Sequence, residues 1–279
     1  GIEFSFMDLR NEISRIWPAF TKKTLDQLKS VSKAAKYETV PCTEIEALFN
    51  LYITYASYML STQDKNLETD RELDLELAGI AAQADIMPMK DENRLFVKSC
   101  VKSINSNHIN LGLSILLSKL KLNYANLNAT DLGWTVIPCL NAAGRMGQSE
   151  LSLKLLLSEN AQEAQELAQA IISLNEDRKK FVNDALYYTK NLADESMEKS
   201  KGKLVVVADD RVHKGLTGLL AGKYLGEYKV PSLAVTKVED TYSGSMRCPD
   251  SVVATEFLKS FGEDFFITYG GHNAAAGFS

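Results

Sequence analysis

The stretch "KGKLVVVADDRVHKGLTGLLAG", residues 201–222, marks a change in the character of the chain. The residues before it favour helices, whereas "KLVVVADD" is a short β-branched run that predicts a buried strand. The elements expected after it are a helix at 215–228, strands at 230–238 and 240–248, a helix at 251–261 and a strand at 264–271. Because strands alternate with helices, this end of the chain is expected to form an α/β layer with a mixed sheet.

The residues before the change predict mainly helices. Residues 43–60 begin with Thr43 and Glu46 in capping-box spacing and continue with apolar residues at helical intervals. A second helix within 70–88 is expected to end before Pro88. The charged stretch 159–201 has almost no helix breakers and predicts one or two long helices that connect two domains. The expected division is 1–157, 158–201 and 202–279.

Composition limits the function classes. The hydrophobic fraction of 45% and charged fraction of 24% are those of an ordinary globular protein. The net charge of −5 means that any phosphate-binding surface must be a minority patch on an acidic molecule. The four cysteines form no C-x-x-C pair, which fits a reducing compartment and predicts a cytoplasmic protein. No apolar run reaches membrane-spanning length, so no membrane partner is expected.

The first candidate site follows the strand at 203–210. His213 lies in the turn, and Gly215 and Gly218 lie where the next helix begins. Glycines there let backbone N–H groups approach a ligand, and a helix N-terminus favours an anion. An alternative is that the glycines only allow the helix to pack closely on the strand.

Two further candidate groups lie downstream. Ser245 and Arg247 are two residues apart, so on a strand they share a face and offer a hydroxyl beside a forked guanidinium. The alternative is a solvated edge strand. In "GGHNAAAGF" (270–278), Gly270 and Gly271 permit an unusual turn that presents His272, and the alanines after it leave room for a bulky ligand.

Two candidates lie in the helical part. "LNAAGRMG" (140–147) places Arg145 between glycines after small residues, in the same way as the histidine motif. Asp85 ends a largely apolar helix, where a carboxylate is costly unless it is paired or binds a cation. A solvated Asp85 at the helix end is the alternative.

Five motifs together resemble a known family. Residues 78–94, 140–147, 212–224, 242–248 and 270–278 occur in the order found in RecJ-type proteins of the DHH phosphoesterase superfamily. The resemblance covers about residue 72 to the end. It implies the mainly helical rear part of a DHH domain, a long connecting helix and a smaller α/β DHH-associated domain with a mixed sheet.

The resemblance also implies an activity and a set of site residues. The activity is 5′-to-3′ hydrolysis of single-stranded DNA in repair and recombination, with two Mn²⁺ or Mg²⁺ ions. Single-stranded DNA is the expected partner, and single-strand-binding or other repair proteins are further candidates. By resemblance Asp85 is a metal ligand, and Arg145 and His272 are catalytic. The residues that match phosphate-binding positions are Arg145, His213, Gly215, Ser245, Arg247, Gly270, Gly271 and His272.

The chain also departs from the family pattern. The Asp-x-Asp and Asp-His-His metal motifs do not occur, and none of the three histidines has a histidine neighbour. We therefore expect a fragment whose missing motifs lie upstream and which is inactive alone, with residues 11–70 as a helical insertion. Two alternatives remain open: a phosphodiesterase for oligonucleotides or cyclic dinucleotides, and a non-catalytic module that binds nucleic acid or protein.

Overall fold

The computed structural model describes residues 8–24, 26–27, 29, 43–63, 67–262 and 264–279. The chain divides into two compact units, residues 1–74 and 75–279. Helix α4 (Leu67–Ala84) runs through the division. Among the described residues, no helix is both long enough and apolar enough to span a membrane.

The first unit is helical. It contains α1 (Leu9–Ile16), the short helix η1 (Pro18–Phe20) and α3 (Glu44–Gln63). The predicted capping box at the start of α3 is confirmed, because Glu46 N donates to Thr43 Oγ1 at 3.2 Å and Thr43 N donates to Glu46 Oε2 at 2.6 Å. The predicted insertion at 11–70 lies within this unit, and parts of it lie outside the described residues.

The second unit begins with a helical part built on one apolar core. Leu113, Leu116, Leu132, Leu155 and other fully buried side chains form this core. Its helices are α5 (Asp91–Asn105), α6 (Leu111–Lys119), η3 (Tyr124–Asn126), α7 (Ala129–Asp131), the π-helical turn η4 (Leu132–Val136), α8 (Ile137–Arg145) and α9 (Ser149–Leu157).

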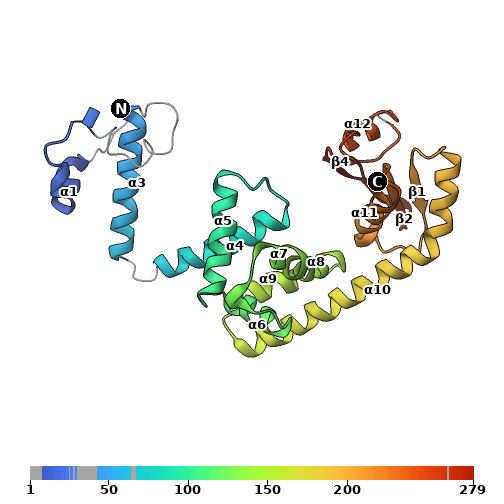
Figure 1. The fold of residues 1–279 in the computed structure, drawn as a ribbon, viewed down its shortest axis with the longest axis horizontal. Coiled ribbons are helices and arrows are strands. Elements are labelled where there is room, and N and C mark those ends of the chain that lie inside the picture. Colours follow the sequence, from blue (N-terminus) through green and yellow to red (C-terminus); the bar gives the residue numbers. More distant parts are fainter. Residues whose placement is uncertain (1–7, 25, 28, 30–42, 64–66, 263) are drawn as a thin grey trace. The chain divides into compact units, whose positions relative to one another are not determined.

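One continuous helix, α10 (Ala161–Lys199), connects this part to a sheet (Figure 1). Asn160 caps it by accepting hydrogen bonds from Gln162 N and Glu163 N. Ala164 and Ala168 of α10 lie in the helical core, whereas Ala185 and Ala193 lie in the core beneath the sheet. The proposed boundaries at 157/158 and 201/202 remain predictions.

The sheet has five strands in the order β1-β2-β3-β5-β4. β1 and β2 are parallel and the other pairs are antiparallel, so the predicted mixed sheet is confirmed. The elements are β1 (Val205–Ala208), η5 (Lys214–Leu216), α11 (Thr217–Tyr228), β2 (Ser232–Val238), β3 (Thr241–Arg247), α12 (Ala254–Lys259), β4 (Tyr269–His272) and β5 (Ala275–Phe278).

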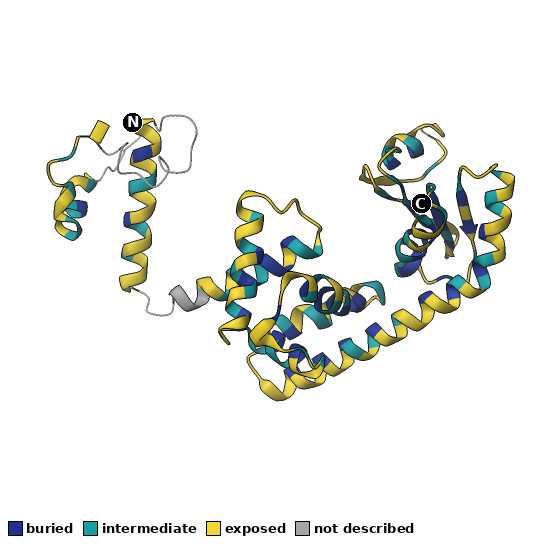
Figure 2. Ribbon diagram, viewed as in Figure 1, coloured by how far each residue is buried: buried dark blue, intermediate teal, exposed yellow. Residues whose placement is uncertain are grey.

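Helices cover the two faces of the sheet differently. Helices α10 and α11 pack on one face, in a core with Val205, Val207 and Ala234. Helix α12 packs on the other face, in a core with Met246 and Ala276. In Figure 2, residues coloured as buried lie on the strands and on the helices next to them.

The last two strands differ from the expected strand at 264–271. The strand expected at 264–271 begins only at Tyr269, because the aromatic segment before it packs into the core on the α12 side, with Phe266 at 5.3 Å from Phe278 between ring centroids. The small residues after His272 also form a strand, β5, which pairs with β3 on one side and β4 on the other.

Candidate functional site

Arg145 is the last residue of α8 and lies half-buried beside two other arginines. Burial, followed by the positive charges of Arg178 and Arg247, lowers the pKa of Arg145. Burial also lowers the pKa of Arg178 and of Arg247. None of the three has a carboxylate within ion-pair distance among the described residues. Three cations without a counter-ion in one region favour an anionic ligand.

The sequence did not single out Arg178, which comes from α10. Its Nε donates to Asn175 Oδ1 at 3.1 Å, and the Asn175 side chain is itself buried. The pair is spaced three residues apart and therefore shares a face of the helix. That spacing was the available signal, although it does not show that the face turns toward Arg145.

Ser245 and Arg247 lie on the same face of β3, as predicted from their spacing. That face meets the start of α11. Thr217 Oγ1 and Ser245 Oγ are 2.9 Å apart. A Cβ atom on Gly218 would lie 2.8 Å from Arg247 Nη2 and 3.5 Å from Ser245 Oγ. Gly218 therefore makes room for the guanidinium and lets the start of α11 lie close to β3, which is the packing role given as the alternative for this glycine.

The strand register explains the small residues around His272. Arg247 pairs with Ala275, and Ala275 pairs with His272, so the three residues form one row across β3, β5 and β4. Strands lie about 4.8 Å apart, which places the Cα atoms of Arg247 and His272 about 10 Å apart with only a methyl group between them.

The next row has still less side-chain volume. Ser245 pairs with Gly277, and Gly277 pairs with Gly270. No atom lies within 4 Å of a Cβ built on Gly270, so the space above it is open. Gly271 has a φ of +153°, and its Cβ would lie 2.2 Å from the Ala275 carbonyl oxygen, so this position needs glycine. We name these two rows, bounded by Arg247 and His272, the sheet shelf.

The turn after β1 brings the two parts of the second unit into contact. The exposed His213 caps η5 by accepting a hydrogen bond at Nδ1 from Gly215 N, at 3.2 Å. A Cβ on Gly215 would lie 1.9 Å from the carbonyl oxygen of Arg145. The absence of a side chain at Gly215 is therefore what allows this turn to touch the end of α8.

A shallow pocket of about 570 Å³ lies at this contact. Asp85, Asn141, Arg145, Ser149 and Gly215 are among the residues that line it. Asp85 is exposed just beyond the end of α4, as the position of Pro88 predicted. Among the described residues, no group of three or more histidine, cysteine, aspartate or glutamate side chains could hold a metal ion. The donor set therefore does not fit a two-metal site.

The structure brings most of the predicted residues into one region. Asp85, Arg145 and Gly215 line the same pocket, and the positive charge of Arg247 lowers the pKa of Arg145. Ser245, Arg247 and His272 border the sheet shelf with Gly270. Within the described residues, no hydrogen bond or ion pair links His272 to Arg145. The roles of all these residues remain predictions.

Comparisons with known proteins agree with this architecture, although no family model matches the chain. The chain is 31% identical over 212 residues to the single-stranded-DNA-specific exonuclease RecJ of Bacillus subtilis, which covers 73% of this chain and 26% of that protein. It resembles the crystal structure of Thermus thermophilus RecJ with Mn²⁺ at a TM-score of 0.64 and 31% identity, over 74% of this chain and 30% of the other.

The same relative with Mg²⁺ gives a TM-score of 0.65 at 25% identity, over 88% of this chain and 36% of the other. The chain thus spans between 26% and 36% of the length of these two relatives. The order of the motifs, the long connecting helix and the mixed sheet all agree with this match. The chain is therefore RecJ-like, and about three quarters of it is related to a part of the RecJ single-stranded-DNA-specific exonucleases.

Proposed function

We propose that this chain is the part of a 5′-to-3′ single-stranded-DNA exonuclease that grips the phosphate backbone. The observation that carries the proposal is the group of arginines without counter-ions, Arg145, Arg178 and Arg247, beside the sheet shelf. Guanidinium groups offer forked donors that match phosphate oxygens. The related exonuclease and the related metal-bound structures supply the reaction class.

Each residue has a defined task in this proposal. Arg247 and Ser245 donate to the oxygens of one phosphate at one border of the shelf. His272, exposed at the other border, donates to a neighbouring phosphate, and the glycine and alanine floor lets the strand lie close to the sheet. Arg145 faces the phosphate nearest Asp85, because both side chains line the same pocket.

Hydrolysis needs more than this chain supplies. In the complete enzyme, Mn²⁺ or Mg²⁺ would activate water and neutralise the charge on the leaving oxygen. Among the described residues, Asp85 is the one carboxylate that lines the pocket, and a two-metal site needs several ligands. We therefore propose that this chain alone binds single strands without cleaving them.

The test is a fluorescence-anisotropy titration of a labelled oligothymidine of about 15 nucleotides at low salt. We expect Arg145→Ala, Arg178→Ala and Arg247→Ala each to weaken binding by about tenfold, since each removes a charge-assisted contact. Each loss should also make the slope of log K against log salt shallower by about 0.7. Cleavage of the oligonucleotide by the purified chain in Mn²⁺ would contradict the proposed inactivity.

Lys237→Ala is the matched control. Lys237 lies on β2 opposite Tyr242, on the face of the sheet away from Ser245 and Arg247, and its side chain is exposed. The variant removes the same charge, so equal weakening by Lys237→Ala would show that only net charge matters. Competition by an unlabelled dinucleotide distinguishes an exonuclease from a phosphodiesterase for oligonucleotides. A dinucleotide that competes as well as unlabelled oligothymidine would favour the phosphodiesterase.

A further inference from the structure

The turn that carries His213 is held by an aspartate at the end of β1. The Asp209 carboxylate accepts three hydrogen bonds from Arg211: from the backbone N at 2.9 Å, from Nε at 2.9 Å and from Nη2 at 2.6 Å. Val212 N donates to the Asp209 carbonyl oxygen at 3.1 Å, which closes the turn. Asp209 N donates to the Val235 carbonyl oxygen at 3.1 Å, so the base of the turn stays attached to β2.

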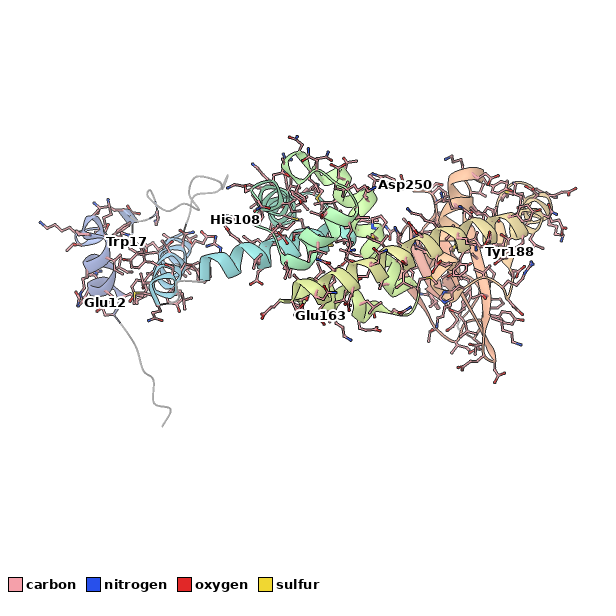
Figure 3. All side chains as sticks on the ribbon, turned by 90° about the horizontal axis from the view of Figure 1, so that it is seen from below. Glu12, Trp17, His108, Glu163, Tyr188 and Asp250 are labelled. Atoms are coloured by element: carbon pink, nitrogen blue, oxygen red, sulfur yellow. The ribbon has the colours of Figure 1, made fainter. Side chains whose placement is uncertain are left out.

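The other side of the Arg211 guanidinium meets α10. Arg211 Cζ lies 4.0 Å from the ring centroid of Tyr188, in cation–π geometry. Figure 3 labels Tyr188 on the part of α10 that runs beside the sheet. The Asp209 side chain is only 12% exposed, whereas that of Arg211 is 64% exposed. Two bonds to one carboxylate and one aromatic face leave the guanidinium little freedom.

Movement of this turn would be transmitted to the candidate site. Val212 is buried beneath the sheet, and His213 follows it directly. His213 in turn binds Gly215 N, and Gly215 touches the backbone of Arg145. The path from Tyr188 to Arg145 therefore consists of consecutive contacts along one short segment.

We propose that Asp209, Arg211 and Tyr188 form a turn clamp that positions His213 and Gly215 beside Arg145 for phosphate binding. Arg211 is a positioning residue in this proposal, and its effect on affinity runs through His213. The proposal rests on the phosphate-binding function proposed above.

The clamp and simple charge attraction predict opposite results for one substitution. Asp209→Asn removes a negative charge near a site for a polyanion, so charge alone would tighten binding. The clamp predicts weaker binding, because asparagine offers Arg211 one acceptor oxygen in place of two. Tyr188→Leu removes the ring without changing any charge, and Tyr188→Phe keeps the ring.

The experiment is the same oligothymidine titration with these variants, each checked for folding by thermal melting. We expect Asp209→Asn and Tyr188→Leu to weaken binding by about three- to tenfold. Tyr188→Phe should bind as the wild-type protein does. Since the clamp acts through His213, Asp209→Asn should add little to the loss caused by His213→Ala in the double variant. Tighter or unchanged binding by Asp209→Asn, or fully additive losses in the double variant, would overturn the clamp.

A second measurement does not depend on DNA binding. The chain has three histidines, so the imidazole signals of His108, His213 and His272 can be assigned by NMR through single substitutions. Asp209→Asn and Tyr188→Leu should shift the His213 signal and leave that of His108 in place. If the His213 signal does not shift, the clamp proposal is wrong, and the proposed phosphate grip is unaffected. If Arg247→Ala binds the oligothymidine normally, the proposed phosphate grip is wrong, and the NMR result is unaffected.

Discussion

Gly215 is the residue at which the helical part and the sheet part of the second unit touch. Its hypothetical Cβ would lie 1.9 Å from the Arg145 carbonyl oxygen and 2.8 Å from the carbonyl carbon. Both atoms belong to the backbone, which cannot turn aside as a flexible side chain can. An alanine at this position must therefore separate the turn from the end of α8.

We expect Gly215→Ala to lower the free energy of unfolding by about 1–3 kcal/mol, as overpacking of a close contact does. Urea unfolding followed by circular dichroism measures the change. Gly222→Ala is the control, because Gly222 lies inside α11 with no atom within 4 Å of its hypothetical Cβ. That variant should gain about 0.5–1 kcal/mol through helix propensity alone. The two substitutions must therefore move stability in opposite directions.

The surroundings of His272 could be predicted only in part from the sequence. Its small neighbours predicted cleared space, and the register places Ala275 between Arg247 and His272. The sequence does not show that Arg247 and His272 are two strands apart, because that depends on strand order. Arg178 was missed for the same reason, since its proximity to Arg145 arises only when α10 packs against α8.

Glu76 links the elements of the helical core. It lies on α4 with its side chain fully buried, and its Oε1 accepts a hydrogen bond from Asn110 N at the start of α6, at 3.1 Å. Oε2 has no hydrogen-bond partner among the described residues. Burial raises the pKa of Glu76 from 4.5 to about 7, against the opposing effect of the Asn110 hydrogen bond. Such a carboxyl group makes the packing of α4 against α6 depend on pH.

The direction of this dependence follows from linkage. Between pH 4.5 and about 7 the folded protein keeps a proton that the unfolded chain has lost, so stability falls as the pH rises. Full ionisation costs about 3 kcal/mol, since each pKa unit corresponds to about 1.4 kcal/mol. We expect urea unfolding to show this loss of stability between pH 4.5 and about 7, and Glu76→Gln to remove it.

Glu76→Gln should also be more stable than the wild-type protein at pH 8, because the amide carries no charge to desolvate. Glu163→Gln is a control at an exposed carboxylate, at the first turn of α10. If the free energy of unfolding of the wild-type protein and that of Glu76→Gln change with pH in the same way, Glu76 ionises normally in the folded state.

The elements differed in how far the sequence could predict them. The capping box at Thr43, the stop before Pro88 and the breaker-free stretch of α10 are local signals, and the helices they predict are present. Strand β5 has the sequence "AAGF", which has little strand propensity of its own. It becomes a strand because β3 and β4 supply hydrogen-bonding partners on both sides. The sequence could not show this pairing.

At the scale of the whole molecule, α10 sets the distance between the two parts that share the candidate site. Its first half packs into the helical core and its second half into the core beneath the sheet. Arg145 belongs to the first part and Arg247 to the second. The contact at Gly215 and the unbroken course of α10 are therefore two separate constraints on the spacing of these arginines.

Lys180 lies in the exposed middle of α10, between the residues that enter the two cores. Lys180→Pro removes a helical hydrogen bond and clashes with the carbonyl of residue 176, which kinks the helix. We expect it to reduce oligothymidine affinity by more than about tenfold, because each arginine would then act without the other. Lys180→Ala removes the same charge, keeps the helix unbroken and should bind within about twofold of wild type. If both variants bind alike, with circular dichroism showing both folded, the arginines grip the strand independently of α10, and the Gly215 contact alone aligns them.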